Sequence, residues 1–233
     1  MEWIGLAVLA WAAGVLSAVT GFGGAAILLP VLVSRLGVRE AVVALTIAQL
    51  CGNLSRVWFN RRWIDGHVVR SFTVGAVPAA IVGSLLFAAA PLGMLTVVLG
   101  AVLVLMVVTR RLLRCNYPRL RARGFVGLGA ATGIISAIVG TSGPLAAPFF
   151  LGCGLIRGSY IGTEAATAGI LHLVKSFVYG ATSVMAPQAI GVGLWLGAAL
   201  WIGAYFGKRI VDRLPAHLFV ALVELALIAS GIR

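Results

Sequence analysis

Long apolar runs, separated by short basic or uncharged links, are the dominant pattern of the chain. A helix needs about 20 mostly apolar residues to cross the roughly 30 Å hydrocarbon core of a bilayer. Runs near that length predict an all-α polytopic membrane protein. The predicted full spans are 41–59, 68–89, 93–109, 159–180, 189–207 and 217–232.

Two further apolar runs, 4–36 and 124–153, are too long for one simple span, and glycine interrupts each near its middle. They contain GVLSAVTGFGGAAILLP (14–30) and GIISAIVGTSGPLAAP (133–148). These stretches match at the first Gly, the Ser-Ala pair, two later Gly residues and the last Pro, with a single-residue gap. The match predicts an internal duplication in which each half begins with a broken or re-entrant helical hairpin.

The basic links predict how the two halves are oriented. Lys and Arg are enriched in cytoplasmic loops, and they cluster here at 61–70, 110–123 and 208–213. These clusters fall on one side of the membrane only if both hairpins enter and leave on the same side. The halves are then inverted repeats with both termini outside, and Arg35 and Arg39 lie on the outer face.

The rest of each half supports the duplication. After its hairpin, each half has a span with one internal cation (Arg56 or Lys175), a glycine-rich span and a plain last span. The predicted organisation is a first repeat over 1–109, with hairpin 4–36; a basic cytoplasmic linker over 110–123; and a second repeat over 124–233, with hairpin 124–153.

Composition excludes several classes of protein. Of 233 residues, 61% are hydrophobic and only 10% are charged, against about 25% charged in a soluble domain. The net charge of +12 follows the positive-inside pattern, so no nucleic acid partner is needed. The cysteines (Cys51, Cys115, Cys153) are far apart, which argues against a thiol relay. The sequence has no Walker loop, no HExxH motif and no clustered His/Cys spacing, so we expect no enzyme activity, cofactor or metal.

The two glycine breaks predict an anion site. Unpaired backbone groups are costly in hydrocarbon, so a broken helix at membrane depth must line protein or a water-filled cavity. Short helices that begin after the breaks would aim N–H groups and a positive dipole end at the bilayer middle, which favours anions. Close packing or a kink explains one such glycine, but two matched breaks favour a site. The predicted substrate contacts are Thr20, Gly21, Phe22, Gly23 and Gly24, and in the second break Gly140, Thr141, Ser142 and Gly143.

Polar side chains within the spans extend this set. Cations inside a membrane span usually face a bundle interior or a cavity. Arg56, Lys175 and Asn53 are therefore predicted to contact or attract the substrate, although Arg56 is close enough to a span end to snorkel to the headgroups. His172 and Glu164 are candidates for carrying a coupled proton, with hydrogen-bonded packing as the alternative for His172.

With these features the chain resembles the TauE/SafE family of sulfite-exporter-like membrane proteins. The resemblance covers nearly the whole chain and depends on the order and duplication of its motifs. They are GFGGAAILLP at 21–30, GTSGPLAAP at 140–148, GTEAATAGILHLVKSFVYG at 162–180 and GAYFGKRIVDRLP at 203–215.

The resemblance implies an exporter-like secondary carrier of sulfite, sulfoacetate or related organosulfonates in a bacterial inner membrane. The residues themselves place the substrate near the midplane between the two hairpins, with alternating access. An anion channel and a non-transporting assembly or biogenesis factor, docked through the basic segment 109–123, remain alternatives. The predicted partners are the anion and the lipid bilayer, and a homo-oligomer contact at Glu224 stays open.

Overall fold

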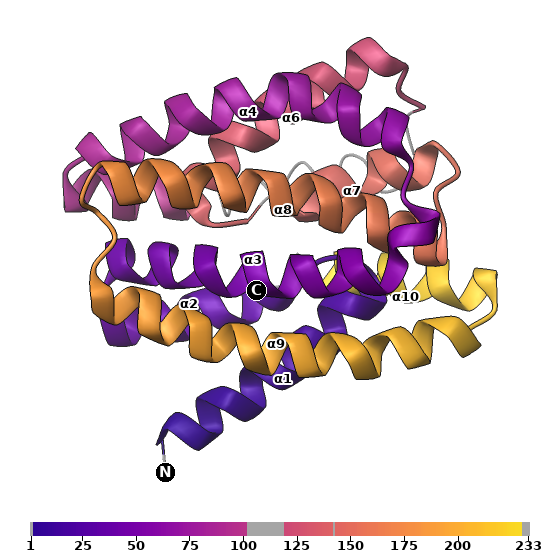
Figure 1. Cartoon of the computed structure of the whole chain (residues 1–233), viewed down its shortest axis with the longest axis horizontal. Helices are drawn as coiled ribbons and strands as arrows, with labels where there is room; N and C mark the ends of the chain where they lie inside the picture. The colour runs from indigo at the N-terminus through magenta and orange to yellow at the C-terminus, as the bar shows by residue number, and fades with distance from the viewer. Residues whose placement is uncertain (1, 102–118, 142, 230–233) are drawn as a thin grey trace.

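The computed structural model describes residues 2–101, 119–141 and 143–229, and every regular element in these ranges is a helix. This confirms the predicted all-α class. Most of the helices lie side by side along the long axis of the molecule (Figure 1). In the first half they are α1 (Glu2–Thr20), α2 (Gly24–Leu36), α3 (Val38–Asn60), the 3-10 helix η1 (Arg61–Trp63), α4 (Gly66–Ala89) and a helix over Leu92–Ala101. The second half has α6 (Ala122–Val139), α7 (Gly143–Gly152), α8 (Arg157–Ala181), α9 (Pro187–Arg213) and α10 (Ala216–Ala229).

Within the described ranges, four helices are long and apolar enough to cross a membrane. They are Val38–Trp63, Gly66–Ala89, Ala122–Val139 and Pro187–Arg213. Helix α9 extends beyond the predicted span 189–207, because the charged residues that follow the span continue the helix to Arg213. Lys208 and Asp212, one turn apart, form an ion pair on that exposed end. Part of the predicted span 93–109 and most of the linker 110–123 fall outside the described residues.

Both long apolar runs are interrupted where the glycines predict. Helix α1 ends at Thr20 and α2 begins at Gly24, while α6 ends at Val139 and α7 begins at Gly143. In Figure 1, α2 runs back toward the end of the molecule at which α3 starts, and α7 runs back toward the opposite end, at which α8 starts. Each run is therefore a bent pair of helices rather than one straight helix.

Basic links gather at one end of the molecule. At one end Arg157 Nη2 donates to the Asp212 carbonyl (3.2 Å), and the Asp65 N–H, which follows η1, donates to Thr163 Oγ1 (2.9 Å). The basic links after α3 and α9 therefore lie together with the start of α8. At the other end, Arg39 Nη2 donates to the Ala90 carbonyl (2.6 Å).

Glycine allows the helices of the two halves to cross closely. Helix α4 packs along α6, and α1 packs along α9. A Cβ on Gly75 of α4 would lie 1.9 Å from the Val126 carbonyl oxygen, and one on Gly203 of α9 would lie 2.2 Å from the Trp11 carbonyl oxygen. Side chains are excluded at both crossings, as is typical of helices that associate in lipid.

Helices α3 and α8 pack against each other and carry the polar interior. Both helices also contribute residues to the apolar core of the bundle. A buried polar group in a membrane protein is costly and usually functional, so this pair of helices positions the site. Its buried polar residues are Thr46, Gln49, Asn53, Ser55, Arg56 and Asn60 on α3 and Thr163, Glu164, Thr167, His172 and Lys175 on α8.

Candidate functional site

The first break is held open by left-handed glycines. Gly21 (φ 85°) and Gly23 (φ 105°) adopt a backbone conformation that disfavours other residues. The Gly24 N–H, the first of α2, donates to Ser17 Oγ on α1 (2.9 Å). Thr20 Oγ1 lies 2.5 Å from the Phe22 carbonyl oxygen, so its hydroxyl closes the turn.

The second break is built in a similar way. Gly140 (φ 82°) follows the last residue of α6, and its N–H donates to the Ser136 carbonyl (2.9 Å). Helix α7 then begins with Gly143, and Pro144 occupies its first turn, where a missing N–H costs nothing. A Cβ on Gly143 would lie only 2.7 Å from Phe22 Cβ, so the two breaks touch at this point.

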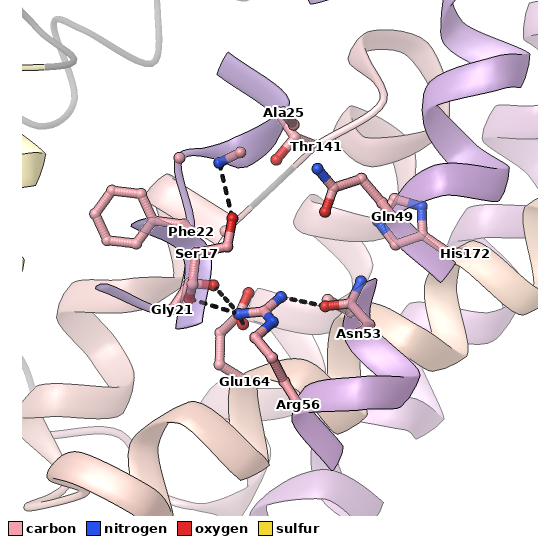
Figure 2. Close-up of a pocket in the computed structure, with 14 residues that line it drawn as sticks. Ser17, Gly21, Phe22, Ala25, Gln49, Asn53, Arg56, Thr141, Glu164 and His172 are labelled. Carbon is pink, nitrogen blue, oxygen red and sulfur yellow. Dashed lines mark hydrogen bonds and ion pairs between the residues drawn. The ribbon is translucent and has the colours of Figure 1, made fainter. Parts of the chain in front are cut away.

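Arg56 joins the first break to α8. Its guanidinium donates to the Gly21 carbonyl (2.5 Å), the Ser17 carbonyl (3.2 Å) and Glu164 Oε2 (2.9 Å), and it also contacts Asn53 Oδ1. Figure 2 shows the guanidinium between Gly21, Glu164 and Asn53. Arg56 is 4% exposed, so its side chain turns inward and does not snorkel to the headgroups.

Glu164 is the acidic partner in this cluster. Its Oε2 pairs with Arg56 at 2.9 Å, and its Oε1 lies 3.2 Å from the position that a Cβ on Gly143 would take. The carboxylate therefore lies between a cation of α3 and the first residue of α7. Both the guanidinium and a helix N-terminus favour negative charge there.

A small cavity lies where the breaks meet α3 and α8. The centre of a water molecule can move within about 20 Å³ of it. The cavity therefore has room for about one water. Gln49 Nε2 and His172 Nδ1 are buried here and have no hydrogen-bond partner among the described residues. The lining residues are Ser17, Gly21, Phe22, Gly23, Gly24, Ala25, Gln49, Asn53, Arg56, Thr141, Gly143, Glu164, Ala168 and His172.

Lys175 lies outside this lining. Its Nζ donates to the Ser136 carbonyl (3.0 Å) and to Ser136 Oγ (2.9 Å) at the end of α6. Arg56 makes the corresponding contact with the Ser17 carbonyl at the end of α1. Each cation follows its serine by 39 residues, so the two halves repeat this contact in the same register.

The predicted contacts and the cavity lining share residues at the breaks and on α3 and α8. Of the predicted substrate contacts, Thr20, Gly140 and Lys175 do not line the cavity, and Ser142 lies outside the described residues. Their roles stay predictions. The predicted residues that do line it are Gly21, Phe22, Gly23, Gly24, Asn53, Arg56, Thr141, Gly143, Glu164 and His172.

Two polar lining residues were not among the predicted contacts. Ser17 belongs to the Ser-Ala pair that the two breaks share, so the duplication itself carried the signal. Gln49 precedes Asn53 by four residues and Arg56 by seven, a spacing that places all three on one helix face. That spacing was visible in the sequence.

A helical membrane bundle whose broken helices enclose a buried polar cavity has the architecture of a solute transporter. The chain matches the family model described as Sulfite exporter TauE/SafE over residues 6–233, and it belongs to this family. The family is one of membrane transporters and not of enzymes. No curated protein and no solved structure gives a significant match.

Proposed function

We propose that the protein is a secondary transporter of small sulfur-containing anions such as sulfite, sulfoacetate or related organosulfonates. The anion binds in the cavity between the two breaks and reaches either side by alternating access. The observation that carries this proposal is the buried guanidinium of Arg56, which lines a cavity at the meeting point of both breaks.

The chemistry of the lining fits an oxyanion. Arg56 supplies a planar array of N–H donors that matches the oxygens of a sulfite or sulfonate group. The Gln49 amide Nε2 is a buried donor that lacks an acceptor, and an unmade hydrogen bond of this kind costs about 1–3 kcal/mol. An anion oxygen would satisfy it.

The small cavity favours a carrier over an anion channel. A continuous pore needs room for a hydrated ion along its length, whereas this cavity holds about one water. Transport therefore requires the surrounding helices to move. Such motion is expected where two helical hairpins can rock against the helix pair α3 and α8.

Flux in proteoliposomes tests the proposal. Wild-type protein should move sulfite, and sulfite on the far side should accelerate exchange, which a simple channel does not show. Arg56→Gln/Glu164→Gln removes both charges of the pair and keeps polar side chains of similar length. Because a hydrogen bond to a charged group is worth about 1.5–3 kcal/mol, this variant should bind sulfite about ten- to hundredfold more weakly.

Two results would overturn the proposal. Sulfite and the related sulfonates could fail to cross in wild-type vesicles, which would favour the assembly-factor alternative. The double variant could also transport at the wild-type rate, which would remove Arg56 from the site. A Glu40→Gln control changes one charge at the exposed start of α3 and should transport normally.

The proposal includes an orientation in a bacterial inner membrane. The end that holds Arg61, Arg62 and the charged end of α9 faces the cytoplasm, because cytoplasmic links are rich in Lys and Arg. The chain termini then face outward. Arg39 lies at the outer end, where its bond to the Ala90 carbonyl supplies a partner for a cation that the positive-inside bias does not favour there.

A further inference from the structure

We propose that the Glu164 carboxylate is a built-in competitor that occupies the anion's place on Arg56, and that the transported anion binds by displacing it. This inference rests on the proposed function and names how that site is regulated. The ion pair (2.9 Å) lies inside the cavity lining, and each of its side chains is 4% exposed.

Charge balance in the cavity is the first reason. Bringing an anion into a buried site is costly unless a cation there is free to pair with it. Among the lining residues the ionised groups are Arg56 and Glu164, which neutralise each other, and His172 is the other titratable side chain. Lys175 contacts Ser136 away from the lining. The guanidinium becomes available to an anion only when Glu164 leaves it.

Space is the second reason. The cavity has room for about one water (about 20 Å³), whereas sulfite has four heavy atoms. Some lining group must move when the anion enters. Moving Glu164 off Arg56 provides both room and the positive charge, and Gln49 Nε2 is a further buried donor in the same cavity lining.

The displaced carboxylate has a stabilising position close by. Its Oε1 already lies against Gly143, the first residue of α7. The positive end of that helix dipole favours an anion, so Glu164 keeps a favourable partner after it leaves Arg56. A short movement between two positive groups is therefore enough for the exchange.

The other half of the molecule shows that packing does not require an acid here. Ser17 of the first half corresponds to Ser136 of the second, and Arg56 corresponds to Lys175. With the same offset in residue number, the residue that corresponds to Glu164 is Leu45. Leu45 is fully buried on α3 and lies near Gly140 of the second break. An apolar side chain fills the equivalent position, so packing alone does not explain a carboxylate on α8. Competition between Glu164 and the anion for Arg56 does explain it.

The test is the dissociation constant of purified protein for sulfite, measured by calorimetry at one pH. In Glu164→Gln the guanidinium has no internal carboxylate, so sulfite should bind about tenfold more tightly than to wild type, as expected when a competing state is removed. Glu164→Asp keeps the charge but is one methylene shorter, and its affinity should fall between the two. It serves as the second variant if Glu164→Gln does not fold. Glu40→Gln should bind as wild type does.

The same variants distinguish competition from a general gain of positive charge. Competition predicts that the tighter binding of Glu164→Gln disappears in Arg56→Gln/Glu164→Gln, because the benefit acts through the guanidinium. The inference is overturned if Glu164→Gln and Glu164→Asp bind sulfite no more tightly than wild type, or if the double variant keeps the gain. If wild type neither binds nor transports sulfite, the proposed function fails as well.

Discussion

The contact between the two breaks predicts that Gly143→Ala impairs transport. The added Cβ would lie 2.7 Å from Phe22 Cβ of the first break and 3.2 Å from Glu164 Oε1. Overpacking of this kind costs about 1–3 kcal/mol. The neighbours that must shift both line the cavity, so the strain acts on the site.

The expected loss of transport follows from the overpacking energy of Gly143→Ala. The conformation in which the two breaks touch is taken to be a required step of the transport cycle. Raising the free energy of this conformation by about 1–3 kcal/mol lowers its population about five- to hundredfold. Initial sulfite uptake into proteoliposomes, normalised to the amount of reconstituted protein, should fall by a similar factor. Size-exclusion chromatography and thermal unfolding in detergent establish that the variant is folded.

Gly127→Ala is the matched control. Gly127 lies on α6, and a Cβ there would meet no atom within 4 Å. Alanine is favoured over glycine in a helix by up to about 1 kcal/mol, so this variant should unfold at the same or a higher temperature and transport normally. Wild-type uptake by folded Gly143→Ala would refute the reasoning, because it would show that the contact between the breaks does not matter for transport.

Three further predictions follow from the packing and the orientation. Gly75→Ala places a Cβ against a carbonyl of α6 and should lower the unfolding temperature more than Gly143→Ala does; an unchanged temperature would contradict the close crossing. Lys175→Ala removes both bonds to Ser136 and should abolish sulfite flux without loss of expression, whereas unchanged flux would remove Lys175 from the mechanism. With Cys51, Cys115 and Cys153 replaced by serine, a single cysteine at Ser34 should react with membrane-impermeant reagents from the outside and one at Arg62 from the cytoplasmic side, and the reverse pattern would contradict the orientation.

The helical architecture could be predicted well from the sequence because the bilayer restricts the choices. Apolar length sets the spans, and the predicted spans 41–59 and 68–89 lie within α3 and α4. The breaks were predicted because glycine and proline recur in matched positions in two runs. The end of α9 was predicted less well, because charged residues that leave the hydrocarbon continue the helix to Arg213.

The partners within the site could be predicted only in part. Burial of Arg56 and its pairing with Glu164 depend on how α3 packs against α8, two helices that are far apart in sequence, and no local pattern encodes that pairing. The bond between Lys175 and Ser136 depends in the same way on the contact between α6 and α8. Sequence spacing gave the right helix faces, whereas tertiary packing decided which side chains meet.

The central claim is that the cavity between the two breaks is the anion site, and a crystal structure of the protein soaked with selenite tests it most directly. Selenite has the shape and charge of sulfite, and selenium gives an anomalous signal that locates it. The account predicts one selenium peak within hydrogen-bonding reach of Arg56 and Gln49, with Glu164 moved away from the guanidinium. A peak at another position, with Arg56 and Glu164 still paired, would contradict it.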